Sequence, residues 1–263
     1  MEMPLIHQLA YSWTGWPKSG ALPTAPADDL LASLDAAWAG DGLTRISHRW
    51  SPDRTQFTFH AGPHLAPATI AARAKGRLDH ALRQAGWRHG FSRKISLRAL
   101  GENTLDIVLA YIATQLDRAE LADPRYLDSL AAAAWENPAF DLADPSPSAH
   151  GRYWFDLHLV AVTDSRWRVG REDFLDRIRP CVLAWGDTLA TGGRDPGRSP
   201  GVRSLAVMPD HIHLAVRGPH DRSPADLAGD LWRHLNRAAG CRLFSDEIYV
   251  GTFSEYPLAA IRR

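Results

Sequence analysis

The sequence predicts an α+β protein in which two similar domains, each with an antiparallel sheet, are fused in one chain. The chain has 263 residues, of which 45% are hydrophobic and 23% charged, and such a composition is typical of a globular protein with a packed core. Two observations favour two domains. One half of the sequence recurs in the other, and both halves show the same order of strand-like and helix-like apolar patterns.

The repeat is clearest around two helix-like segments. Residues 61–86 read AGPHLAPATIAARAKGRLDHALRQAG, and residues 217–240 read RGPHDRSPADLAGDLWRHLNRAAG. Each contains Gly-Pro-His, then a proline near the first helical turn, and ends at Ala-Gly, where proline and glycine respectively are favoured. FSRKISLRALGENTL (91–105) then aligns with FSDEIYVGTFSEYPL (244–258). One copy therefore covers about half of the chain.

Apolar periodicity gives both copies the same succession: a strand, a helix, two strands, a helix, a strand and a final helix. In the first copy these are the strands 6–16, 44–50, 55–60 and 93–100 and the helices 27–39, 67–84 and 104–120. In the second they are the strands 153–163, 203–207, 211–217 and 247–253 and the helices 171–188 and 224–238, with a truncated last helix from Pro257. Antiparallel strands with helices on one face predict ferredoxin-like domains.

The predicted domains are residues 1–130 and 151–263, joined by a linker at 131–150. Prolines and mixed polar residues in this stretch favour an extended connection. A second loop, TGGRDPGRSPG (191–201), is expected to be mobile. Two such domains in one chain predict an intramolecular pseudo-dimer, and the sequence leaves open whether it pairs again.

Charge and cysteine usage exclude several classes of protein. Lys+Arg and Asp+Glu number 30 each, so no global basic field indicates a nucleic-acid partner, although local asymmetry can remain. The two cysteines, Cys181 and Cys241, form no disulfide framework, which fits a reducing compartment. No secretory leader and no run of 18 apolar residues is present, so we expect a cytoplasmic protein without a membrane partner.

The segment VMPDHIHL (207–214) places two histidines two residues apart on a predicted strand. Residues i and i+2 of a strand point to the same face, so His211 and His213 would stand side by side. Two such imidazoles can hold a divalent cation. The alternative is a pair of ordinary strand histidines, and the His-x-His pattern alone leaves both interpretations open.

The last helix of the first copy carries Tyr111 and Gln115. Residues i and i+4 share one helical face, so both side chains can reach one site. The alternative for Tyr111 is a tyrosine whose ring packs on the sheet.

The stretch SLAVMPDHIHLAV resembles the HUH motif of the single-tyrosine transposases of small insertion sequences and their domesticated repeat-associated relatives. GPHDRSPADLAGDLWRHL resembles the helix that follows in that family, and FSRKISLRALGENTLDIVLAYIATQ resembles its catalytic strand and tyrosine helix. The resemblance implies cleavage and rejoining of single-stranded or hairpin DNA through a 5′-phosphotyrosine. It makes Tyr111 the nucleophile, and His211, His213 and Gln115 the ligands of Mg²⁺ or Mn²⁺.

The two copies lack complementary parts of this pattern. Where the second has PDHIH, the first has PDRTQ (52–56), or TQF (55–57) in the other register, without an imidazole pair. The second copy ends before a counterpart of Tyr111. We therefore expect one composite site, with the histidines from the second copy and the tyrosine helix from the first. Tyr249 and Tyr256 are less favoured nucleophiles.

Two other functions stay open at this point. Loss of one histidine pair also suits a domesticated, catalytically inactive protein that binds structured DNA. A metal-binding or metal-sensing protein that uses His211 and His213 without a DNA partner is a third class.

A local excess of cations predicts a DNA surface. Between Ala71 and Leu100 eight cations face one acid, and such a patch gives salt-sensitive binding to phosphates. The residues that we expect to contact DNA are Arg73, Lys75, Arg77, Arg88, Arg93, Lys94 and Arg98. Trp87 and His89 lie among them and could stack on an unpaired base. With such a DNA surface, we expect the protein to associate with the nucleoid. An exposed, solvated helix is the alternative.

The chain has 10 tryptophans, a large number for its length. We interpret nine of them as packing residues in the core or between domains. These are Trp13, Trp16, Trp38, Trp50, Trp135, Trp154, Trp167, Trp185 and Trp232.

Overall fold

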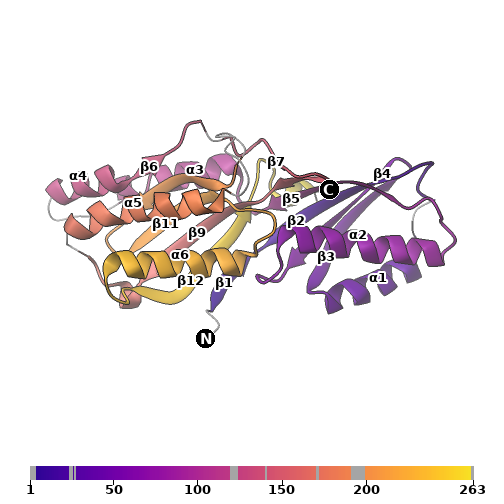
Figure 1. Cartoon of the computed structure of the whole chain (residues 1–263), viewed down its shortest axis with the longest axis horizontal. Coiled ribbons are helices and arrows are strands. Elements are labelled where there is room, and N and C mark those ends of the chain that lie inside the picture. The colour runs from indigo at the N-terminus through magenta and orange to yellow at the C-terminus, as the bar shows by residue number, and fades with distance from the viewer. Residues whose placement is uncertain are drawn as a thin grey trace.

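The structure, a computed structural model, describes residues 4–23, 26, 28–118, 124–139, 141–169, 172–190 and 199–261. Within these ranges the chain forms an α+β protein with two six-stranded mixed sheets, which lie end to end along the long axis of the molecule (Figure 1). The first sheet, sheet A, has the order β1 (Leu5–Gln8), β12 (Phe244–Phe253), β9 (Asp156–Thr163), β11 (His211–Arg217), β10 (Gly201–Val207) and β6 (Trp135–Glu136). The second, sheet B, has the order β3 (Leu43–Ser51), β4 (Arg54–Ala61), β2 (Ala10–Pro17), β5 (Phe91–Leu100), β8 (Gly151–Trp154) and β7 (Ser146–Pro147).

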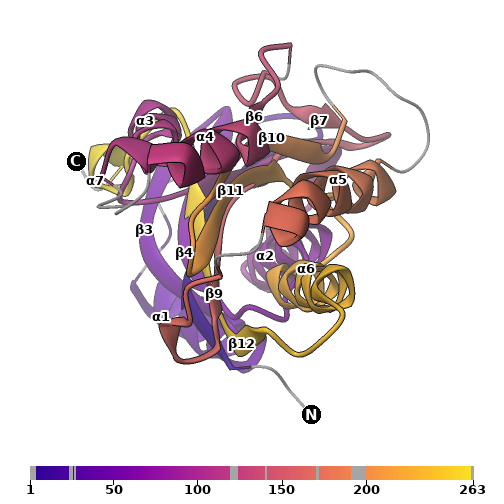
Figure 2. The ribbon, with the colours of Figure 1, turned by 90° about the vertical axis from the view of Figure 1, so that its left-hand side faces the viewer.

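Most of the long helices cover one side of the two sheets. They are α1 (Asp28–Gly40) and α2 (Pro67–Gln84) on sheet B, and α5 (Glu172–Leu189) and α6 (Pro224–Ala239) on sheet A. The opposite side carries α3 (Leu105–Ala113) and α7 (Leu258–Ile261), as Figure 2 shows. A further helix, α4 (Pro124–Ala133), packs on α5 and β10. Two short 3₁₀ helices, η1 and η2, span Leu116–Arg118 and Asp164–Arg166.

The predicted order of elements is found in both copies, but the first strand of each copy is wrong as a single strand. The first breaks after Gln8 into β1 and β2, and the second breaks after Trp154 into β8 and β9. The early piece of each crosses to the other sheet, where β1 pairs parallel with β12 and β8 pairs parallel with β5. The sheets are therefore mixed, not antiparallel throughout. The alternation of apolar residues predicts that a segment is a strand, but it does not predict which strand it pairs with.

The predicted helix 104–120 is also too long, because α3 ends at Ala113. Helix α4 and the short strand β6 were not predicted from the sequence. Most of the loop expected to be mobile, residues 191–198, lies outside the described residues. Among the described residues no helix combines the length and apolar character that a membrane crossing requires.

The two halves exchange backbone hydrogen bonds reciprocally where β5 and β12 end. Leu105 N, at the start of α3, donates to Ser254 O (2.7 Å), and Leu258 N, at the start of α7, donates to Gly101 O (2.8 Å). A second exchange joins the segments at α2 and α6, from Ala68 N to His220 O (2.8 Å) and from Ala225 N to Pro63 O (2.9 Å). The strand of each half thus delivers its following helix to the sheet of the other half.

The core follows the expected apolar faces. Trp13, Trp38 and Trp185 are fully buried, and the Trp38 ring meets that of Phe59 edge-on at a centroid distance of 4.9 Å. Burial of such large side chains is a main source of stability. Trp167 contradicts the packing prediction, because 71% of it is exposed.

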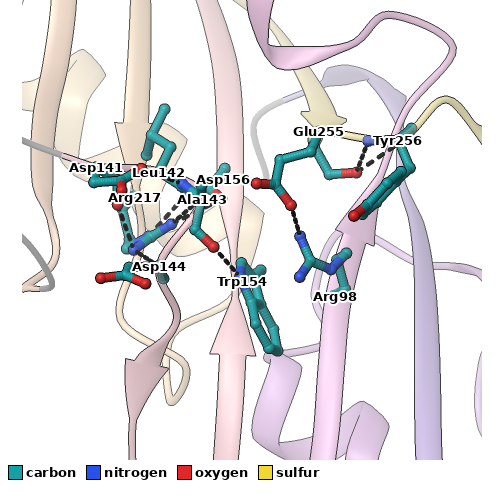
Figure 3. Close-up of polar contacts among 11 residues, drawn as sticks. Arg98, Asp141, Leu142, Ala143, Asp144, Trp154, Asp156, Arg217, Glu255 and Tyr256 are labelled. Carbon is teal, nitrogen blue, oxygen red and sulfur yellow. Dashed lines mark hydrogen bonds and ion pairs between the residues drawn. The ribbon is translucent and has the colours of Figure 1, made fainter.

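A buried arginine anchors the segment between the two predicted domains (Figure 3). The side chains of Arg217 and Asp156 are 0% and 2% exposed, and Arg217 Nε donates to Asp156 Oδ1 at 2.8 Å. The remaining donors of the guanidinium bind the carbonyl oxygens of Asp141, Leu142 and Asp144. Because a buried charge needs such partners, this part of the linker is fixed to sheet A.

Candidate active site

A cavity of about 530 Å³ lies between α3 and the face of sheet A that is opposite to α5 and α6. Strands from the second half and a helix from the first half form its walls. It is lined by Ile6, Asn103, Ile107, Val108, Tyr111, His158, Val160, Val162, Arg166, His211, His213, Glu247 and Tyr249.

Strand β11 brings His211 and His213 to this cavity, on one face of the strand. The alternate residues Ile212 and Leu214 are 1% and 0% exposed in the core, so the histidines point the other way. Their ring centroids are 4.9 Å apart, with the rings nearly perpendicular. The prediction that His211 and His213 lie on the same face of their strand is therefore confirmed.

Each of the two imidazoles has a ring nitrogen that a neighbour occupies. His211 Nδ1 lies 2.6 Å from Asp210 Oδ1, and His213 Nδ1 lies 3.1 Å from Nε2 of a third histidine, His158 of β9. His213 Nε2 is buried and has no hydrogen-bond partner among the described residues. A metal-binding histidine typically has one nitrogen held in this way while the other faces the ligand.

Burial controls the protonation of this cluster. It lowers the pKa of His158 to about 4 and, together with the neighbouring His158, His211 and Arg166, that of His213 to about 3. Both rings are therefore neutral near pH 7. The neutral imidazole is the form that binds a metal ion.

His158 was not predicted as a site residue, although the sequence contains a signal for it. In DLHLVAV (156–162) the flanking Leu157 and Leu159 are fully buried. A polar residue between two apolar ones on a strand points to the opposite face, which is the face that carries His211 and His213.

Helix α3 places Tyr111 over this cluster. Val108 and Ile112 bury one side of the helix on sheet A against Ala206, Ala215 and Phe253. The Tyr111 ring, 38% exposed, meets the His213 ring edge-on at a centroid distance of 5.2 Å. The structure thus brings a tyrosine of the first half to the histidines of the second, as the composite arrangement predicts.

Gln115 is placed differently from the expectation. Because α3 ends at Ala113, Gln115 lies beyond the last helical turn and the i, i+4 rule does not apply to it. Its Nε2 donates to the carbonyl oxygen of Tyr111 at 2.8 Å. Gln115 is 6% exposed and is not a lining residue of the cavity, so its role as a third metal ligand stays a prediction.

The donor set fits a divalent cation in part. In the part of the chain that the structure describes, no three His, Cys, Asp or Glu side chains are placed to hold a metal ion together. Two imidazoles, His211 and His213, have the alternating geometry and the orienting partners of metal ligands, and the buried Nε2 of His213 needs a partner. A cation here would need oxygen ligands from solvent or substrate.

Comparisons with known proteins add little. No family model matches this chain, and no curated protein is similar to it in sequence. The solved structure of the regulatory subunit of aspartate kinase from Thermus flavus is similar at 12% identity and a TM-score of 0.20 over 88% of this chain and 94% of that one. A likeness at this TM-score carries no argument about fold or function.

The equivalent face of sheet B lacks the imidazole pair. Thr55 and Phe57 are fully buried in the core, so Arg54 and Gln56 take the opposite face of β4, at the positions where β11 has His211 and His213. Gln56 Nε2 donates to Ser12 Oγ at 2.6 Å. Of the two sequence registers, the one that aligns PDRTQ with PDHIH therefore agrees with the strand faces.

Two other tyrosines were less favoured as nucleophiles. Tyr249 lines the cavity, its ring 5.9 Å from that of His158, and its hydroxyl donates to Gln8 Oε1 at 3.2 Å. Burial raises the pKa of Tyr249. Tyr256 is 54% exposed and lies beside Arg98, outside the cavity (Figure 3).

The structure divides the cations predicted to bind DNA. Arg73 and Arg77 both contact Asp41, and Lys75 Nζ donates to Ser92 O at 2.7 Å. Arg98 Nη1 pairs with Glu255 Oε2 at 2.9 Å (Figure 3). Cations with such partners have fewer donors to offer to phosphates. The remaining three, all exposed, are Arg88, Arg93 and Lys94.

The expectation that Trp87 stacks on a base is wrong. The residue is 8% exposed, and its ring packs against that of Phe91 at 5.2 Å. Its Nε1 donates to Ala21 O at 3.0 Å. His89, in contrast, is exposed.

Proposed function

We propose that this chain cleaves and rejoins single-stranded or hairpin DNA in one composite centre, with Tyr111 as the nucleophile. The single observation that carries the proposal is the contact between the Tyr111 ring of the first half and the His213 ring of the second. A partly exposed phenol beside neutral imidazoles suits covalent catalysis on a phosphate.

The chemistry is a transesterification. The Tyr111 oxygen forms a bond to phosphorus, and the bond from phosphorus to the 3′ oxygen breaks. The phenol proton passes to solvent, the 3′ oxygen takes up a proton, and the DNA keeps its phosphate as a 5′-phosphotyrosine. Rejoining reverses these steps without an external energy source.

His211 and His213 would hold a Mg²⁺ or Mn²⁺ ion, which supplies charge neutralisation at the phosphate when bound. Asp210 and His158 orient these two rings through the hydrogen bonds described above. Arg166, which also lines the cavity, adds a fixed positive charge for the phosphate oxygens.

We further infer that each half is an HUH-like, ferredoxin-like domain and that the two form a pseudo-dimer. The reciprocal bonds of Leu105 with Ser254 and of Leu258 with Gly101 support this, because they relate the halves as a twofold axis relates two subunits. The second centre would be inactive, since Arg54 and Gln56 replace the imidazoles.

A denaturing gel tests the proposal. The probe is a pool of hairpin-bearing single-stranded oligonucleotides with random flanks, labelled at the 3′ end because the 3′ fragment stays on the tyrosine. With Mn²⁺ or Mg²⁺ we expect a labelled covalent band for the wild-type chain. Tyr111→Phe should abolish the band and retain the native gel shift. Tyr249→Phe, a matched change in the same cavity, should retain both.

A covalent band that persists in Tyr111→Phe and is lost in Tyr249→Phe would assign the nucleophile to β12 instead. A native shift without a covalent band in any condition would favour the inactive DNA-binding protein. The position of Gln115 outside the cavity is the observation that favours this second candidate. Metal binding without salt-dependent binding of oligonucleotides would favour a metal-binding protein.

A further inference from the structure

A second cavity, of about 680 Å³, lies on sheet B where β5 and β8 pair. Its volume falls in the range of about 300–1,000 Å³ that is usual for ligand sites. Its walls come from the end of β2, from β5, from β8 and from the segment before β8. We call it the Trp154 groove, and it is lined by Trp16, Pro17, Ser92, Lys94, Ile95, Ser96, Ser148, Ala149, His150, Gly151, Arg152 and Trp154.

The two charged residues in the wall of the Trp154 groove, Lys94 and Arg152, are both cations. Lys94 and Arg152 are exposed, and within the described residues neither side chain forms an ion pair or hydrogen bond. His150 also lines the groove, and no aspartate or glutamate does. Arg73 and Arg77 on α2, in contrast, are both engaged by Asp41. Lys94 and Arg152 are therefore available to phosphate oxygens.

The groove also offers indole surface that the fold holds in place. Trp154 Nε1 donates to Ala143 O at 2.6 Å, and the Arg98 guanidinium stacks 4.0 Å from the centre of its ring. Glu255 and Tyr256 fix Arg98 from its other side (Figure 3). A ring held in this way loses little entropy when a base stacks on it, and Trp16 gives a second, half-buried indole.

We propose that the Trp154 groove binds unpaired nucleotides of the DNA, with bases on Trp16 and Trp154 and phosphates at Lys94 and Arg152. Aromatic stacking is worth about 1–3 kcal/mol per base and tolerates any sequence, and two cations release counterions from two phosphates. The inference rests on the proposed function only for the source of the DNA strand. Binding of that strand in the groove does not depend on the proposed function.

The position of the groove suits a strand that reaches the candidate active site. Trp154 and His158 are four residues apart on successive strands, and an extended chain of this length spans at most about 14 Å. Single-stranded DNA held in the groove therefore stays near the cavity that contains Tyr111.

The test measures binding alone, in Tyr111→Phe with EDTA, by fluorescence anisotropy of a labelled ten-residue oligothymidylate. The groove variant is Lys94→Gln with Arg152→Gln. Its control is Arg54→Gln with Arg237→Gln, which removes equal charge from exposed sites that neither line the groove nor belong to the predicted DNA contacts.

We expect the groove variant to weaken binding at least tenfold and to reduce the slope of log Kd against log salt by about one to two. The control should change Kd less than threefold. Equal weakening by both variants would mean diffuse attraction to basic surface and would overturn the inference, as would absence of binding by the parent chain. Excess thymidine monophosphate should not displace the oligonucleotide; displacement at equal concentration would assign the groove to free nucleotides.

Photocrosslinking locates the contact independently of affinity. An oligonucleotide with 5-iododeoxyuridine should crosslink to peptides that contain Trp16 or residues 148–154, and crosslinks confined to other peptides would contradict the proposal. The covalent-band assay on the unmutated chain reports the proposed cleavage separately. Binding without cleavage would support the groove as a DNA-binding site and would contradict only the proposed cleavage reaction.

Discussion

His158 and His213 face each other through Nε2 and Nδ1 at 3.1 Å, so a single proton lies between two neutral rings. If His213 carries that proton, its buried Nε2 has a free lone pair. This is the tautomer that a metal ligand needs. His158 is therefore placed as the acceptor that selects the tautomer.

Removal of this acceptor should weaken metal binding. We expect His158→Ala to reduce the Mn²⁺ affinity of the chain by about 10–100-fold, the usual effect of losing an orienting partner. His158→Gln should retain more of it, because its amide oxygen can accept the same hydrogen bond. Isothermal titration calorimetry with Mn²⁺ measures both. Equal affinity in wild type and His158→Ala would show that His158 does not orient His213.

The same two histidines should make stability depend on pH. In the unfolded chain their pKa is about 6.5, whereas burial lowers the pKa in the folded chain to about 4 for His158 and about 3 for His213. The unfolded chain then binds more protons below pH ~6.5, so the free energy of unfolding falls as the pH decreases toward 4 and 3. Each unit of pKa difference is worth up to about 1.4 kcal/mol per site.

Urea unfolding between pH 7.5 and pH 4, with EDTA present, measures this dependence. The double variant His158→Gln, His213→Gln should show a flatter curve over that range. An unchanged slope in the variant would mean that other groups cause the acid sensitivity.

Two buried threonines on opposite sheets should respond differently to the same change. Thr252 Oγ1 accepts from Ala10 N at 3.0 Å and donates to carbonyl oxygens of the first half, so it links the halves. Thr252→Val leaves these groups unpaired and should cost about 1–3 kcal/mol. The Thr58 hydroxyl is buried without a partner among the described residues, and Thr58→Val should be neutral or stabilising. Urea unfolding measures both variants, and their midpoints are compared where the unfolding free energy depends equally on urea concentration. Equal losses of stability in the two variants would contradict the different roles of the two hydroxyl groups.

The Arg217–Asp156 pair should be costly to break from one side. Arg217→Met leaves a buried carboxylate and the carbonyl oxygens of Leu142 and Asp144 unpaired, at about 3–5 kcal/mol. Adding Asp156→Leu should recover part of this loss, because no unpaired charge remains. Limited proteolysis should cut the 137–149 segment earlier in both variants than in wild type. Unchanged proteolysis would show that Arg217 does not anchor the linker.

The sequence was most informative where local periodicity decides the structure. The limits of α2 and of β11 match their apolar patterns residue by residue, because a single core face imposes each pattern. The contact of Tyr111 with His213 could be predicted because the first copy has the tyrosine and lacks the imidazole pair, which pointed to a site shared with the second copy.

Local sequence patterns did not predict the structure where contacts with distant parts of the chain determine it. The strand that begins at Ile6 alternates in the same way whether it pairs with β12 or with β4, so its exchange between sheets was not readable. Gln115 was misplaced because α3 stops at Ala113. There the Thr114 hydroxyl donates to the Ala110 carbonyl oxygen at 2.9 Å, a side-chain bond that competes with the helix.

The reciprocal junction of Leu105 with Ser254 and of Leu258 with Gly101 has a consequence for stoichiometry. Separate subunits that shared a catalytic centre would lose it on dilution, whereas covalent fusion keeps phenol and imidazoles together at any protein concentration. Under the proposed function, with one imidazole pair on sheet A and Arg54 and Gln56 in its place on sheet B, each polypeptide would capture one broken DNA end at a time. Processing both ends of a mobile segment would then require two polypeptides or two successive turnovers.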